Sequence, residues 1–203
     1  MKIICIGRNY SEHAKELNNP LPEKPVFFMK PDSSILKNNK PFFLPNFSQD
    51  VHYEVELVLK ISRLGKNIDE KFADRYFNEI GIGIDFTARD LQKECKSKGL
   101  PWEIAKAFEN SAPLGMFLPK ENFSDLGDIK FHLNINDQTV QMGTSRDMIF
   151  SFNKLISYLS QFFTLKTGDL IFTGTPAGVG PVHKNDHLLA YIEDKLLLDF
   201  RVK

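Results

Sequence analysis

The chain has little of what would indicate a disulfide framework or a nucleic-acid surface. Its 203 residues include two cysteines, Cys5 and Cys95, too few for a disulfide framework or a cysteine-based zinc site. Lysine plus arginine and aspartate plus glutamate number 26 each, so the formal net charge is zero. Nucleic acids and anionic membranes favour proteins with a basic excess. We therefore expect neither as a partner.

Long apolar runs, internal repeats and low-complexity linkers are also missing. The apolar run at residues 3–6 is too short for a signal peptide or a membrane span. A cytoplasmic location is the default expectation. With 42% hydrophobic and 26% charged residues, the composition is that of an ordinary globular protein. A chain of this length is most simply one domain, spanning residues 1–203.

Segments that resemble strands outnumber those that resemble helices. Apolar residues at helical spacing predict a helix over residues 147–163, and shorter helices are expected over 10–17 and 69–77. Strands are predicted over residues 3–6, 26–29, 52–59, 114–118, 130–136, 169–173, 187–192 and 196–202. The helices do not alternate regularly with the strands. This order predicts an α+β or β-rich architecture and argues against a doubly wound parallel sheet.

Two acidic residues, Glu54 and Glu56, interrupt the apolar run at residues 52–59. Side chains alternate between the faces of a strand, so both carboxylates project from the same face. Buried side by side, they would repel each other and lose their hydration unless a divalent cation bound between them. The spacing alone leaves open a second interpretation, a solvated face of an antiparallel sheet.

Asp85 is the candidate for a third ligand, because it ends a second short apolar segment at residues 80–85. We expect Thr87 to cap the following helix, on which Arg89 and Gln92 lie three residues apart and share a face. An acid followed by a cation and an amide could form the wall of a site. Asp85 alone also fits a turn or a helix cap.

A glycine-containing run at residues 173–180 admits two interpretations. It could be a wide connecting turn that uses glycine for unusual dihedral angles. It could also offer backbone amides and the Thr175 hydroxyl to a carboxylate. Nucleotide binding is not expected, because the run lacks the Lys-Ser/Thr ending of a phosphate-binding loop and does not precede a helix.

Several motifs follow one another in a specific order along nearly the whole chain. They are Gly7-Arg8-Asn9-Tyr10 with His13 and Glu16, the Glu54-x-Glu56 strand, residues 83–92, residues 99–102 with Lys106, and residues 168–180. Together they resemble the fumarylacetoacetate hydrolase superfamily, in particular its small single-domain acylpyruvase-like branch. The resemblance implies a mixed β-roll-like fold, a homodimer, and a magnesium or manganese ion held by Glu54, Glu56 and Asp85.

The resemblance also implies roles around that ion. The carboxylate and 2-oxo oxygen of a small 2-oxo acid substrate would chelate the metal, while Lys106 stabilises the developing enolate. Arg89 and Gln92 would bind the distal part of the substrate. Thr175 and neighbouring amides would hold the carboxylate. Three carboxylates on one dication leave a charge near −1, so Lys106 and Arg89 would also supply the positive charge that an anionic substrate needs.

His13 and Glu16 lie three residues apart and share a helix face, in a segment (about residues 8–24) that corresponds to a lid over the substrate. Glu16 would orient His13, and the pair would deprotonate a water that attacks the 4-oxo carbon. On the residues alone, His13 and Lys106 also fit ordinary surface positions.

The implied activity is metal-dependent hydrolysis of a carbon–carbon bond in acylpyruvate-type 2,4-dioxo acids, giving pyruvate and a carboxylic acid. One alternative is an oxaloacetate decarboxylase, or a related 2-oxo acid hydratase or isomerase. A non-catalytic metal- or ligand-binding protein with the same fold is a more remote alternative.

Overall fold

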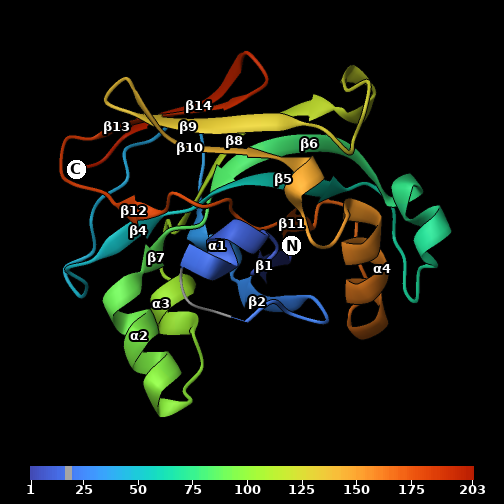
Figure 1. Ribbon diagram of the computed structural model, residues 1–203, viewed down its shortest axis with the longest axis horizontal. Coiled ribbons are helices and arrows are strands. Elements are labelled where there is room, and N and C mark those ends of the chain that lie inside the picture. The colour runs from blue at the N-terminus through green and yellow to red at the C-terminus, as the bar shows by residue number, and fades with distance from the viewer. Residues whose placement is uncertain (17–19) are drawn as a thin grey trace.

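Strands dominate the structure, a computed structural model that describes residues 1–16 and 20–203 (Figure 1). The strands are β1 (Ile3–Gly7), β2 (Val26–Lys30), β3 (Ile35–Leu36), β4 (Val51–Tyr53), β5 (Val55–Ile61), β6 (Phe77–Ile84), β7 (Thr87–Ala88), β8 (Ala112–Pro119), β9 (Lys130–Ile135), β10 (Gln138–Thr144), β11 (Leu170–Phe172), β12 (Gly180–Pro181), β13 (His187–Ile192) and β14 (Lys195–Arg201). The α-helices are α1 (Ser11–Glu16), α2 (Arg89–Lys98), α3 (Glu103–Lys106) and α4 (Phe152–Phe162). Short 3-10 helices are η1 (Asp32–Ser34), η2 (Glu70–Tyr76), η3 (Lys120–Asn122) and η4 (Ser145–Asp147).

The strands form a mixed, curled set of sheets. Within the described residues, the largest sheet has seven strands in the order β2-β1-β11-β5-β6-β8-β3, a second has the order β10-β9-β13-β14, and a third has β12-β4-β7. The pairs β1–β11 and β3–β8 are parallel, and the other neighbours are antiparallel. In Figure 1 the sheet of β10, β9, β13 and β14 lies above β5 and β6, with α4 at one end of the molecule and α2 and α3 at the other. This arrangement confirms the predicted α+β class.

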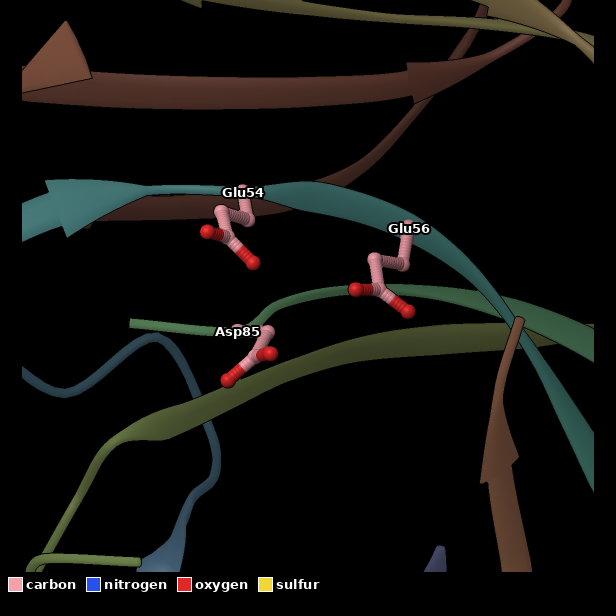
Figure 2. A group of neighbouring side chains, drawn as sticks. All are labelled: Glu54, Glu56 and Asp85. Carbon is pink, nitrogen blue, oxygen red and sulfur yellow. The ribbon is translucent and has the colours of Figure 1, made fainter. Parts of the chain in front are cut away.

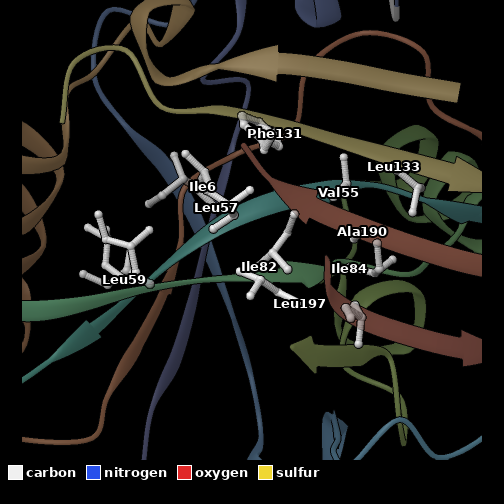
Figure 3. Packing of buried hydrophobic residues seen from close by; sticks show 14 of the residues in the cluster. Ile6, Val55, Leu57, Leu59, Ile82, Ile84, Phe131, Leu133, Ala190 and Leu197 are labelled. Carbon is white, nitrogen blue, oxygen red and sulfur yellow. The ribbon is translucent and has the colours of Figure 1, made fainter. Parts of the chain in front are cut away.

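Alternation along β5 separates the hydrophobic core from the candidate site. Val55, Leu57 and Leu59 are fully buried in one cluster that includes residues of β9 and β13 (Figure 3). The intervening Val58 belongs to a second cluster formed with residues of β1 and β11. Glu56 alternates with Leu57 and therefore shares the face of Val58. Burial of each large aliphatic side chain contributes about 1.5–3 kcal/mol, so the core rigidly holds the strand that carries Glu56.

The predicted strand over residues 52–59 is interrupted at Glu54. The segment before it, β4, pairs with β7 and β12, whereas β5 pairs with β6 and β11. The chain thus passes from one sheet to another at Glu54. The sequence does not indicate this change of sheet, because both strands are buried and the apolar run continues through them.

The predicted helix over 147–163 begins later than its apolar spacing indicates. Ser151 caps α4, because its side chain accepts a hydrogen bond from the Lys154 amide at 3.3 Å. Met148 and Ile149 precede the cap and pack against the same core without being helical. The apolar spacing continues across Ser151 because the segments before and after it both pack against that core.

Two shorter helix predictions also differ from the structure. The segment expected as a helix over 69–77 is the 3-10 helix η2, preceded by Asp69, whose side chain accepts from the Lys71 amide. The helix expected over 10–17 is α1, and residue 17 lies outside the described residues. Among the described residues, no helix is long and apolar enough to cross a membrane.

Candidate metal centre and active-site pocket

Glu54, Glu56 and Asp85 meet in the structure. Each offers a carboxylate oxygen, and these atoms lie within 4.8 Å of one another. Figure 2 shows Glu54 and Glu56 projecting from one chain segment toward Asp85, which follows β6. The Asp85 amide donates to the Glu54 carbonyl at 2.8 Å and so fixes the two segments together. The three residues are 6%, 2% and 1% exposed, which excludes the solvated sheet face.

Two predicted cations lie against this cluster. Lys106 Nζ is 2.8 Å from Glu54 Oε2, 2.6 Å from Asp85 Oδ2 and 2.5 Å from the Thr87 hydroxyl. Arg89 Nη2 is 2.5 Å from Glu54 Oε1. Burial alone would raise the pKa of Glu54, but Lys106 and Arg89 outweigh it and hold that pKa well below its ordinary value.

Lys106 is buried, yet its ammonium keeps its charge. Burial lowers the pKa of Lys106, but the charges of Asp85 and Glu54 outweigh burial and raise it above the ordinary value. Thr87 does not cap the helix as expected, because it lies in β7 and α2 begins without a side-chain cap. Its hydroxyl instead faces Lys106 Nζ.

A third cation, Lys30, was not predicted from the sequence. Its ammonium is 2.8 Å from Asp85 Oδ1 and 2.9 Å from the Ser111 hydroxyl, and it also contacts the Lys106 carbonyl. Lys30 is 2% exposed, and a buried lysine almost always needs a partner. A lysine that ends the apolar strand at residues 26–29 was the available signal, although its partners are distant in the sequence.

Glu56 differs from its two neighbours because, within the described residues, no lysine or arginine forms an ion pair with it. Its Oε2 accepts a hydrogen bond from the Gly174 amide at 2.7 Å. Burial, together with the charges of Asp85 and Glu54, raises its pKa well above the ordinary value. A divalent cation would supply the missing positive charge. Three carboxylates suit hard ions such as Mg²⁺ and Mn²⁺, so the residues present fit such a metal.

The glycine run contributes backbone to the site. Gly174 has a φ of 102°, a left-handed conformation that glycine tolerates. Thr175 follows it, donates its hydroxyl hydrogen to the Val55 carbonyl at 2.9 Å and accepts from Gln141 Nε2 at 2.9 Å. The run is therefore both a structural connection and a wall of the site.

All the predicted site residues except Glu16 line one pocket. They are Glu54, Glu56, Asp85, Lys106, Arg89, Gln92, His13 and Thr175. Glu16 joins through His13, whose Nδ1 lies 3.0 Å from Glu16 Oε2. Glu16 Oε1 also accepts from the Gly178 amide at 3.0 Å, so α1 is connected to the glycine run. The predicted lid, residues 8–24, includes residues 17–19, which lie outside the described residues.

Arg89 and Gln92 form one hydrogen-bonded wall. Arg89 Nη1 donates to Gln92 Oε1 at 2.8 Å. Among the described residues, nothing accepts a hydrogen bond from the buried Arg89 Nε. An unpaired buried donor is costly, and an anionic ligand group would satisfy it.

A comparison with protein families matches the fumarylacetoacetate (FAA) hydrolase C-terminal family to residues 2–202. The chain belongs to this family. Its relatives include the mitochondrial oxaloacetate tautomerase FAHD1 of Mus musculus, 41% identical over 201 residues, which are 99% of this chain and 91% of the relative. The mitochondrial oxaloacetate decarboxylase of Dictyostelium discoideum is 43% identical over 182 residues, covering 89% of this chain and 84% of the relative.

Solved structures of this family have the same fold. The fumarylpyruvate hydrolase of Pseudomonas aeruginosa, crystallised in complex with Mn²⁺ and pyruvate, aligns with a TM-score of 0.93 and 36% identity. The alignment covers 100% of this chain and 89% of that structure. The chain is therefore a member of an enzyme family, with a buried acidic triad that could bind a metal.

Proposed function

We propose that this protein is a divalent-metal enzyme that forms the enolate of oxaloacetate. Keto–enol tautomerisation would be its primary reaction, and decarboxylation to pyruvate would proceed through an enolate as well. Relatives over nearly the whole chain are named as oxaloacetate tautomerases and as an oxaloacetate decarboxylase. These relatives support oxaloacetate more than the acylpyruvates expected from the sequence.

The charge balance of the pocket is the observation that carries this proposal. The three carboxylates of the triad face three buried cations, Lys30, Arg89 and Lys106. Among these six buried groups, a bound divalent ion would leave two positive charges uncompensated. Oxaloacetate at neutral pH carries two carboxylates, whereas acetylpyruvate carries one. A buried site favours the ligand that neutralises it, because uncompensated charge in a low dielectric is costly.

Glu54, Glu56 and Asp85 would hold Mg²⁺ or Mn²⁺, which when bound would act as a Lewis acid toward the 2-oxo acid. Lys106 would stabilise the negative charge that develops on the 2-oxo oxygen, because its ammonium stays protonated beside Glu54 and Asp85. The Arg89 guanidinium and the Gln92 amide would bind the distal part of the substrate.

The His13–Glu16 pair would move the proton. Glu16 holds His13 Nδ1, which leaves Nε2 as the atom that exchanges protons with the substrate. In tautomerisation, His13 takes a proton from C3 of the keto form, and the enolate oxygen is then protonated. In decarboxylation, the C4 carboxylate leaves as carbon dioxide, and C3 of the remaining enolate takes up a proton.

Carbon–carbon hydrolysis of acylpyruvates is the second candidate. The His13–Glu16 pair favours it, since the pair could activate a water that decarboxylation does not need. The related Pseudomonas aeruginosa structure is a fumarylpyruvate hydrolase. The two-charge requirement of the pocket disfavours acylpyruvates with one carboxylate, such as acetylpyruvate, but a dicarboxylate such as fumarylpyruvate meets it. The relatives named for oxaloacetate are the reason for ranking hydrolysis second.

Parallel assays test the assignment. Loss of enol oxaloacetate is followed by ultraviolet absorbance, and pyruvate release is measured from oxaloacetate and from acetylpyruvate, each with magnesium and with EDTA. Controls with metal and no protein correct for spontaneous decay. EDTA-sensitive acceleration with oxaloacetate is expected. Turnover of acetylpyruvate alone would move the assignment to the hydrolase, and turnover of neither would refute both.

The cytoplasmic location and the homodimer remain part of the proposal. The first is the default expectation stated from the sequence, and the family resemblance motivates the second. Fractionation of cells and light scattering of the purified protein would test them. Recovery with an organelle, or a monomer at micromolar concentration, would contradict the respective expectation.

A further inference from the structure

The face of α2 that borders the pocket carries a third polar residue beyond the two already assigned. Arg89, Gln92 and Lys96 are spaced three and four residues apart, so they form one stripe along the helix. All three line the pocket that contains the metal-binding triad. Lys96 is exposed to solvent and lies at the outer end of this stripe.

Arg8 adds a further cation to the same pocket. It follows β1 and has a φ of 61°, a left-handed conformation that is uncommon for a residue with a side chain. Such backbone conformations occur where the surrounding structure holds them, often at ligand sites. Arg8, Arg89 and Lys96 therefore surround the pocket with positive charge beyond the triad.

The charges of Lys96 and Arg8 are not neutralised by the protein. Within the described residues, neither side chain forms an ion pair, and Lys96 Nζ instead lies 5.4 Å from the centre of the Trp102 ring. Desolvation lowers the pKa of Lys96, and the charges of Arg89 and Arg8 lower it further. Lys96 and Arg8 have no ion-pair partner among the described residues, so a bound carboxylate would offset the repulsion between their charges.

We propose that Lys96 and Arg8 extend the Arg89–Gln92 wall into an anion subsite at the mouth of the pocket, which binds the carboxylate remote from the metal and selects dicarboxylates. The inference rests on the proposed binding of a 2-oxo acid at the triad. Trp102 contributes by holding the lysine side chain through the cation–π contact. The class of ligand is a short dicarboxylic acid with an oxygen on the carbon next to one carboxylate.

Unreactive ligands separate the two ends of the site. Malate has the α-oxygen and both carboxylates of oxaloacetate, and lactate has the same chelating end without the distal carboxylate. Their dissociation constants are measured by calorimetry in magnesium for wild type, Lys96→Met and Lys96→Arg. Lys98→Met is the matched control, because Lys98 lies on the same helix but pairs with Glu94 at 2.6 Å in solvent.

Lys96→Met should weaken malate binding about tenfold, or about 1.4 kcal/mol, and leave lactate binding unchanged. Lys96→Arg should retain most of the affinity, and Lys98→Met should behave as wild type. In turnover of oxaloacetate, Lys96→Met should raise KM with kcat nearly unchanged, as expected when ground-state and transition-state binding are lost together. Arg8→Gln should change malate binding in the same direction.

Equal effects of Lys96→Met on malate and lactate, or no effect on either, would overturn the subsite. So would a wild type that binds neither acid. A wild type that binds malate selectively but accelerates no reaction of oxaloacetate would refute the proposed function instead. The binding comparison therefore decides the subsite independently of turnover.

Discussion

Glu56→Gln is the substitution that most sharply separates metal binding from folding. Glutamine has the same shape as glutamate and can still accept the Gly174 amide hydrogen bond at Oε1, but it carries no charge. Glu56 is 2% exposed and, among the described residues, forms no ion pair with a lysine or arginine. We therefore expect the variant to lose metal binding while the metal-free fold becomes more stable.

The expected stabilisation by Glu56→Gln follows from the burial of the Glu56 carboxylate. Loss of an unpaired buried charge next to Asp85 and Glu54 should stabilise the metal-free protein by about 1–3 kcal/mol. For a chain of this length each kcal/mol raises the melting temperature by about 2–4 °C. In wild type, magnesium at 100 times its dissociation constant should add about 2.7 kcal/mol. The variant should show little of this second increase.

The contribution of Glu56 to the stability of the metal-free protein depends on pH. The pKa of Glu56 is raised in the folded protein, so between the ordinary value of 4.5 and the raised value the folded state binds more protons than the unfolded state. The free energy of unfolding of the metal-free wild-type protein therefore decreases as pH increases through that range, because Glu56 must lose its proton in the folded state. Glutamine does not titrate. The advantage of Glu56→Gln should grow from pH 4.5 upward and be small below it.

Thermal melts with magnesium and with EDTA, at several pH values, measure the stabilisation by Glu56→Gln, its pH dependence and the magnesium-dependent increase in melting temperature. Glu79→Gln is the matched control, since Glu79 is also a strand glutamate but pairs with Lys60 at 2.7 Å in a partly exposed position. It should keep the wild-type response to magnesium. A Glu56→Gln protein with a wild-type magnesium shift and full turnover would refute the assignment of the triad.

Three further predictions concern the lid, the glycine run and the fold. His13→Ala should reduce hydrolysis of acetylpyruvate more than decarboxylation of oxaloacetate, and equal losses would contradict water activation by His13. Gly174→Ala should weaken magnesium binding measured by calorimetry, because a Cβ there would lie 2.7 Å from the Asn9 Cβ and displace the amide that binds Glu56. Unchanged affinity would argue against that support. Asp169→Asn should cost about 1–3 kcal/mol in urea unfolding with magnesium affinity retained, because this buried carboxylate accepts from two backbone amides and a lysine; wild-type stability would show these bonds to be dispensable.

Local patterns were enough to predict much of the architecture. The predicted ends of five strands agree with the observed ends to within a residue or two. They are β1, β2, β9, β11 and β13. The spacing of Glu54 and Glu56 correctly indicated a shared direction, because alternation is a property of the strand itself. Their meeting with Asp85 could not follow from spacing, and the family resemblance supplied that expectation.

What the sequence could not show depends on contacts between distant segments. Lys30 reaches Asp85 across 55 positions of chain, and the Gly174 amide reaches Glu56 across 118. The start of α4 was misplaced because Met148 and Ile149 pack against the core without being helical. In each case tertiary packing decided a feature that neighbouring residues do not encode.

The most direct test is a crystal structure of the protein grown with Mn²⁺ and oxalate, with anomalous scattering recorded for manganese. We expect one strong anomalous peak among the carboxylate oxygens of Glu54, Glu56 and Asp85, with both oxalate carboxylates bound to the metal and Lys106 beside the ligand. A peak at another site, or a triad without manganese at saturating concentration, would contradict the assignment of the metal site.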